Sequence, residues 1–139
     1  MFGSATSASH GTAEAAMTLA RLETRPMTGG VLVTVAGEID STNAAGVHSY
    51  IEHDRRPHEP LVLDLSRLTF MDSSGLRVLV HLHEALSREN TSLHLAEVHH
   101  VPARLLRITG VWGVIAAHPT VEQAVSAALG TAEGEKSAF

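Results

Sequence analysis

The stretch TFMDSSGLRVLV, residues 69–80, places an acid, two hydroxyls and a glycine between an apolar segment and an amphipathic helix. Asp and Ser are favoured at helix N-caps, where a side-chain oxygen accepts a hydrogen bond from an unpaired backbone N–H. We therefore predict a helix that begins near Ser73, with Asp72 or Ser73 as its cap. Ser74 is expected to point outward from the first turn, beside Gly75, which would let another backbone approach closely. Capping alone also accounts for these residue types, so the spacing by itself assigns them no chemical role.

The predicted helix carries its charged and polar side chains on one stripe. Four such residues follow one another at intervals that fall on one helical face: Arg77, His81, Glu84 and Arg88. The remaining surface is broad and apolar, so the helix should pack on a sheet. Interfaces favour Met and Arg, so Met71 and this stripe are equally consistent with partner contact and with plain solvated surface. Phe70 is expected to be buried beneath the helix.

Two apolar runs upstream of this helix indicate strands joined by a short turn. Residues 17–25 alternate between apolar and polar side chains, as expected of a half-buried strand. Pro26, Gly29 and Gly30 predict the turn that leads into a second, Val-rich strand over residues 31–40.

The apolar period changes after the second strand. Residues 41–54 show helical spacing, and Asp40 or Ser41 is placed to cap the first turn. LVLDL, residues 61–65, is a short unbroken apolar run of the kind found in central strands that are buried on both faces.

The rest of the chain predicts one more strand and two more helices. The strand covers residues 91–98, one helix has Pro102 in its first turn and Gly110 past its end, and the last covers 121–129 behind a Thr120 cap. Residues 111–118 are ambiguous and fit a short edge strand.

This order of elements predicts an α/β fold with a mixed sheet of about four to five strands flanked by about four helices. The sheet should be antiparallel at its start and parallel later. Right-handed crossovers would bring the loops after Asp40 and Phe70 together.

The bulk properties fit one cytoplasmic domain. The chain has 139 residues, is 44% hydrophobic and 18% charged, and contains no cysteine, which excludes disulfides and thiolate metal sites. The net charge of -5 argues against direct nucleic-acid binding, and no apolar run is long enough to span a membrane. We expect a domain over residues 17–130, with flexible tails at 1–16 and 131–139.

Neither a metal site nor an enzyme is predicted. His81 and His83 point to different helical faces, and His99 and His100 are adjacent without a second ligand cluster. The Gly-x-Ser-x-Gly elbow of a serine hydrolase is missing, and the glycine pair at residues 29–30 indicates a hairpin turn instead of a phosphate-binding loop. We therefore expect no cofactor.

Three stretches together resemble bacterial anti-sigma factor antagonists of the STAS domain family. They are VTVAGEIDSTNA (33–44), LVLDLSRLTFMDSSGLRVLVHLHEAL (61–86) and VPARLLRITGVWGVI (101–115), in the order and spacing of the family. The resemblance covers nearly all of residues 17–130 and implies a STAS-type sheet and a partner-switching function.

In such proteins the unphosphorylated antagonist binds an anti-sigma factor that is itself a serine kinase, and the sigma factor is released. The resemblance implies that the kinase phosphorylates the second serine of the Asp-Ser-Ser-Gly motif, here Ser74, and that a PP2C-type phosphatase resets the protein. Asp40 matches the acidic residue of the Gly-Glu-Ile-Asp turn, and Asp72 and Ser73 match the residues that flank the acceptor. The predicted partner-binding residues are Asp40, Met71, Asp72, Ser73, Gly75 and Arg77.

The residues leave one alternative open. A STAS module can serve as a subunit of a transporter or of a larger signalling assembly, in which the serine would cap or contact without being phosphorylated. The intact acceptor motif favours the free-standing antagonist.

Overall fold

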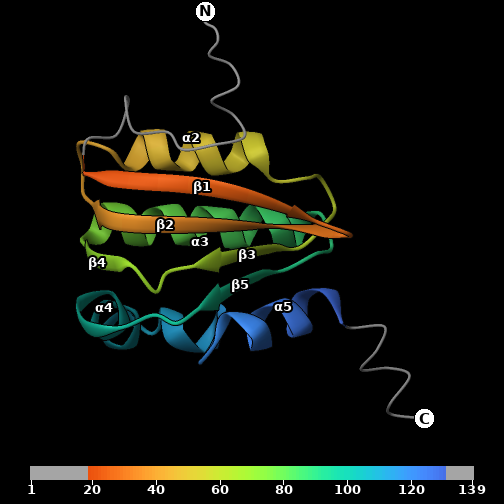
Figure 1. Ribbon diagram of the computed structural model, residues 1–139. Helices are drawn as coiled ribbons and strands as arrows, with labels where there is room; N and C mark the ends of the chain where they lie inside the picture. The colour runs from red at the N-terminus through yellow and green to blue at the C-terminus, as the bar shows by residue number, and fades with distance from the viewer. Residues whose placement is uncertain (1–18, 131–139) are drawn as a thin grey trace, which may run out of the picture.

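The computed structural model describes residues 19–130, and the predicted tails at 1–16 and 131–139 lie outside this range. Within it, six strands form one sheet and four α-helices pack around the sheet (Figure 1). The strands are β1 (Ala20–Met27), β2 (Gly30–Ile39), β3 (Leu61–Asp64), β4 (Leu68–Met71), β5 (Leu93–Ala96) and β6 (Ala116–His118). The helices are α2 (Ala44–Asp54), α3 (Ser73–Arg88), α4 (His100–Thr109) and α5 (Val121–Leu129), and a 3-10 turn, η2 (Val111–Gly113), precedes β6.

The sheet is mixed, as the order of strands and helices predicts. The strand order is β1-β2-β3-β5-β6, with β1 antiparallel to β2 and the other neighbours parallel. The long strand β2 pairs with β3 along its first half and with β4 along its last residues. Ile39 at the end of β2 lies opposite Met71 at the end of β4. The predicted meeting of the loops after Asp40 and Phe70 is therefore confirmed.

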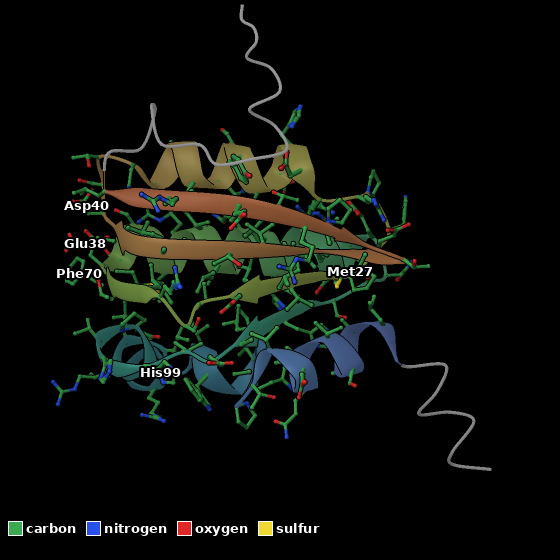
Figure 2. The ribbon with its side chains drawn as sticks, in the orientation of Figure 1. Met27, Glu38, Asp40, Phe70 and His99 are labelled. Carbon is green, nitrogen blue, oxygen red and sulfur yellow. The ribbon has the colours of Figure 1, made fainter. Side chains whose placement is uncertain are left out.

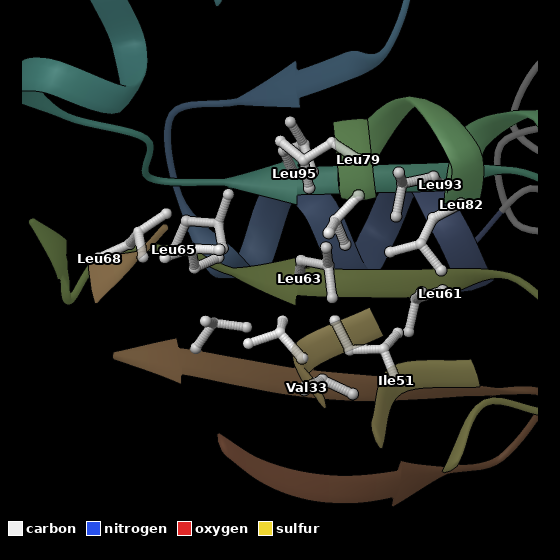
Figure 3. Close-up of a cluster of buried hydrophobic side chains, with 14 of the residues drawn as sticks. Val33, Ile51, Leu61, Leu63, Leu65, Leu68, Leu79, Leu82, Leu93 and Leu95 are labelled. Carbon is white, nitrogen blue, oxygen red and sulfur yellow. The ribbon is translucent and has the colours of Figure 1, made fainter. Parts of the chain in front are cut away.

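Helices cover both faces of the sheet. Helices α2 and α3 pack on one face and α5 on the other, while α4 packs against β4 (Figure 1). One buried cluster lies between the sheet and α2 and α3 and includes Ile51, Leu61, Leu63 and Leu82 (Figure 3). The second cluster lies under α5 and consists of Leu32, Val62, Ala96 and Ala124. Because successive side chains of a strand point to opposite faces, β3 is buried on both sides, as its unbroken apolar run predicts.

The first strand ends two residues later than predicted and includes a residue that we expected in the turn. β1 continues through Pro26 to Met27, and Gly30 already belongs to β2. Proline is tolerated in edge strands such as β1, because alternate N–H positions of an edge strand face solvent instead of a neighbouring strand. Gly29 keeps its predicted place in the turn, with a φ of 88°.

Strand β4 is the element that the sequence analysis did not separate, and it corrects the position of Phe70. Gly37 of β2 lies opposite Leu68 and Glu38 lies opposite Phe70, so Thr69 is an extra residue in β4. Such a bulge shifts the alternation of the strand. Leu68 and Met71 are buried, and Phe70 is 38% exposed. The prediction that Phe70 is buried beneath the helix is wrong for this reason.

The helix starts are partly as predicted. Thr120 caps α5 by accepting a hydrogen bond from the backbone N–H of Gln123. The N-cap of α2, however, is Asn43, and neither Asp40 nor Ser41 fills that role. The ambiguous segment 111–118 forms η2 followed by the short edge strand β6.

Candidate functional site around Ser74

Ser74 lies in the first turn of α3, at the point where Asp72 caps the helix. The Asp72 carboxylate accepts a hydrogen bond from the backbone N–H of Ser74 at 2.8 Å, so Asp72 is the cap that the sequence left undecided between two residues. Ser73 is exposed and Ser74 is half-buried. Ser74 lines an open groove of about 370 Å³ between α2 and α3. The residue is therefore reachable from solvent, as a modification site must be.

Both helices contribute polar side chains to this groove. Its lining consists of Ser41, Ala44, Ala45, His48, Ser74, Arg77, Val78 and His81. The imidazole rings of His48 and His81 lie edge to face, with their centroids 6.1 Å apart. His48 Nε2 is 3.9 Å from a carboxylate oxygen of Glu52, one turn further along α2. The groove thus places a guanidinium and two imidazoles beside a serine hydroxyl.

Asp40 and Asp72 lie on neighbouring loops at the end of the sheet. The backbone N–H of Asp72 donates to the carbonyl oxygen of Ile39 at 3.2 Å, which joins the two loops. The hydroxyl and the backbone N–H of Thr42 donate to the Asp40 carboxylate and lower the pKa of that group. Figure 2 shows Asp40 at the same end of the molecule as Glu38 and Phe70. This end therefore combines carboxylates with an exposed aromatic ring.

Asn43 holds this acidic loop in place, and the sequence analysis missed it. Its side chain is only 4% exposed. The Asn43 Oδ1 atom accepts from the backbone N–H of Asp40 at 2.9 Å, and its Nδ2 donates to the carbonyl oxygen of Glu38 at 2.8 Å. Asn side chains commonly bond to nearby backbone in this way, so an Asn close behind the Gly-Glu-Ile-Asp turn was an available signal.

Two residues of the predicted partner-binding set belong to the core. The Met71 side chain is 1% exposed, and Gly75 is buried. A Cβ atom at Gly75 would lie 3.2 Å from Cγ2 of Ile39, so the glycine allows α3 to approach the sheet of its own chain. The close approach expected at Gly75 is thus made by the sheet of the same chain. We remove Met71 and Gly75 from the predicted interface.

The other predicted residues stand at the surface near Ser74. Ser73 and Arg77 are exposed, and Asp40 and Asp72 are half-buried. The rest of the polar stripe on α3 is exposed as well: His81, Glu84 and Arg88. Among residues 19–130 the Arg77 guanidinium has no ion pair. Contact of these residues with a partner remains a prediction.

Residues 19–130 contain no cluster of three or more His, Asp or Glu side chains that could hold a metal ion. None of the helices in that part of the chain combines the length and hydrophobicity needed to cross a bilayer. The rings of His99 and His100 lie 5.9 Å apart at the start of α4.

The fold and site define a small α/β domain that presents a capped serine turn at the end of a mixed sheet. The family model described as STAS domain matches residues 20–124, and the chain belongs to this family. The resemblance of the three sequence stretches is thereby confirmed.

Curated relatives of this chain are named as anti-sigma factor antagonists. It is 31% identical to the anti-sigma-F factor antagonist RsfA of Mycobacterium tuberculosis over 100 residues, which are 70% of this chain and 78% of RsfA. A crystal structure of an anti-sigma factor antagonist from Mycobacterium paratuberculosis has a TM-score of 0.68 and 29% identity, covering 77% of this chain and 92% of that one.

A second solved relative is the anti-sigma factor antagonist SpoIIAA of Bacillus, at 20% identity. Its unphosphorylated form has a TM-score of 0.63 and covers 78% of this chain and 96% of its own. Its phosphorylated form has a TM-score of 0.55 and covers 76% of this chain and 96% of its own. The names of these relatives describe proteins that antagonise anti-sigma factors.

Proposed function

We propose that this protein is an anti-sigma factor antagonist that is switched by phosphorylation of Ser74. Its unphosphorylated form binds an anti-sigma factor that is a serine kinase, and thereby frees the sigma factor. Phosphorylation of Ser74 by that kinase abolishes binding, and a PP2C-type phosphatase restores it. The observation that carries the proposal is the place of Ser74, in the first turn of α3, open to a groove and next to the Asp40 and Asp72 loops.

The relatives support this proposal. RsfA is named as an antagonist of an anti-sigma factor, and SpoIIAA has been solved in unphosphorylated and phosphorylated forms. A protein of this fold therefore accommodates the modification. The present chain has the Asp-Ser-Ser-Gly motif in which a serine precedes the buried glycine.

Electrostatic repulsion by the phosphoryl group is strong enough to weaken partner binding. Phosphorylation adds about -1.5 to -2 charges at neutral pH, next to the carboxylates of Asp72 and Asp40. A like-charge contact with an acidic partner group at about 4 Å costs about 4 kcal/mol at an effective dielectric constant near 20. Half of that energy weakens binding by more than about tenfold, because each 1.4 kcal/mol is about a factor of ten. The switch needs no refolding of the domain.

The site is tested by mapping phosphorylation with candidate anti-sigma kinases and ATP. We expect mass spectrometry to find one phosphate on Ser74 in the wild type and in Ser73→Ala, and none in Ser74→Ala. Phosphate on Ser73 would move the site by one residue. Modification by none of the candidates would favour the alternative role as a module of a transporter or signalling assembly.

A further inference from the structure

The groove beside Ser74 contains one guanidinium and two imidazoles to which the proposed switch assigns no role. Arg77 follows Ser74 by one turn on α3, and His81 follows Arg77 by one more. His48 faces His81 from α2, with the ring centroids 6.1 Å apart. Arg77 forms no ion pair with any other residue in the 19–130 range. One wall of the groove therefore carries a guanidinium that is free to bind an anion.

We propose that a phosphoryl group on Ser74 is held in this groove, with Arg77 as its main counter-charge and His48 and His81 beside it. The inference rests on the proposed function, because it requires Ser74 to be the modified residue. A phosphoserine carries close to two negative charges and three acceptor oxygens, and a guanidinium offers a planar set of donors that matches them.

The groove has room for this group. Its volume is about 370 Å³. A water molecule occupies about 30 Å³ in the liquid, so three phosphoryl oxygens fit with space to spare. The groove that Ser74 and Arg77 both line can therefore hold the group.

The nearby carboxylates do not compete for the same space. The lining of the groove contains no Asp or Glu. Asp72 is engaged with the backbone N–H of Ser74, and Asp40 is engaged with Thr42. On the helices, Glu52 lies 3.9 Å from His48, and Glu84 lies on the exposed stripe of α3 beyond His81. The charge that faces the groove directly is thus positive or neutral.

Seating the phosphoryl group gives the switch a second component. Arg77 is exposed and is one of the predicted partner contacts. A phosphoryl group that binds its guanidinium withdraws that cation from the partner. Phosphorylation then adds negative charge to the surface and also occupies a positive contact.

The test introduces phosphoserine directly during translation, at position 74 or, as a control, at position 73. Ser73 is exposed and does not line the groove. The second pKa of each phosphoryl group is measured by ³¹P NMR in the full chain. We expect the midpoint at position 74 to lie about half a pH unit below that at position 73, as an exposed ion pair produces. Arg77→Ala should remove this difference, and Arg88→Ala, on the same stripe near the end of α3, should leave it unchanged.

The histidines provide a readout in the unmutated protein. With phosphoserine at position 74, the imidazole NMR signals of His48 and His81 should shift relative to the unmodified protein, because both rings line the groove, and with phosphoserine at position 73 they should stay where they are. Equal phosphoryl midpoints at the two positions overturn the proposal. So does a higher midpoint at position 74, because it would place the group against carboxylates.

This experiment separates the inference from the proposed function. No kinase is used, so a shifted midpoint establishes the seat even when no candidate kinase modifies the chain. The converse result is that a kinase phosphorylates Ser74 while Arg77→Ala leaves the phosphoryl midpoint unchanged. That result supports the proposed switch and contradicts binding of the phosphoryl group by Arg77.

Discussion

A Cβ atom at Gly75 would lie 2.8 Å from the Cβ of Met71, closer than two carbon atoms pack. The first turn of α3 therefore rests directly on the ends of β2 and β4. This contact fixes the height at which Ser74 stands above the sheet. The glycine after the proposed modification site thus serves the packing of the site itself, and the partner is not needed to explain it.

Gly75→Ala should destabilise the domain. The added methyl group meets Met71 and Ile39, which are fully packed, and overpacking of this kind costs about 1 to 3 kcal/mol. Urea denaturation measures the loss. Gly113→Ala is the matched control, because nothing lies within 4 Å of a Cβ there, and its effect should stay within about 0.5 kcal/mol. Equal stabilities of the two variants would contradict the packing argument.

Asn43→Ala should loosen the acidic loop. It leaves the backbone N–H of Asp40 and the carbonyl oxygen of Glu38 without their partner, which costs about 1 to 2 kcal/mol for part-buried groups. Hydrogen exchange of the Asp40 amide should become faster, as measured by NMR. Ser41→Ala, at an exposed position in the same loop, is the control and should change neither the stability of the domain nor the exchange rate of the Asp40 amide. An unchanged exchange rate of the Asp40 amide in Asn43→Ala would show that the loop stays ordered without the hydrogen bonds of Asn43.

Much of the fold could be predicted because it depends on periodicity along the chain. The unbroken run in β3 and the polar stripe of α3 each identify an element and its buried side without reference to any other element. The faces of β4 could not be predicted in this way. They depend on the extra Thr69 opposite the Gly37–Glu38 pair of β2, and register between strands is not contained in the pattern of one strand. That single residue exposes Phe70 and buries Met71.

The candidate site divides in the same manner. Topology alone brings the loops of Asp40 and Asp72 to one edge, so their meeting could be foreseen. The groove could not be foreseen, because His48 comes to line it together with Ser74 and Arg77 only through the packing of α2 on α3. The sequence predicts no metal site at His81, and the position of His48 and His81 in one groove with Ser74 follows only from the tertiary structure.

The ion pair of Arg55 and Glu89 should make stability depend on pH. Two guanidinium nitrogens of Arg55 each lie 2.9 Å from a Glu89 oxygen, and with the His58 backbone N–H they lower the pKa of Glu89 from 4.5 to about 2. A carboxyl group whose pKa is lower in the folded than in the unfolded protein stabilises the fold at pH values above its unfolded pKa. The contribution of Glu89 is therefore complete above pH 4.5 and disappears as the pH falls toward 2. The unfolding temperature of Glu89→Gln should be lower than that of wild type at pH 7, and the two temperatures should converge near pH 2.

The control for this titration is Glu122→Gln, an exposed position on α5. Its unfolding curve should run parallel to that of wild type over the whole range. A difference in unfolding temperature between wild type and Glu89→Gln that stays constant from pH 7 to pH 2 would show that the ion pair does not cause the pH dependence.

Substitutions of Ser74 should separate binding from release. Ser74→Ala keeps the cap, since Asp72 bonds to a backbone N–H, and it should bind the anti-sigma kinase like wild type but fail to dissociate when ATP is added. Ser74→Asp places a carboxylate beside the acidic loops and should weaken binding by about tenfold, measured by calorimetry. Ser87→Asp, an exposed serine near the end of the same helix, controls for added charge and should bind normally. A carboxylate carries less charge than a phosphoryl group, so the loss sets a lower bound on the switch. Equal affinities of Ser74→Asp and wild type for the kinase would contradict the proposal that negative charge at position 74 causes release.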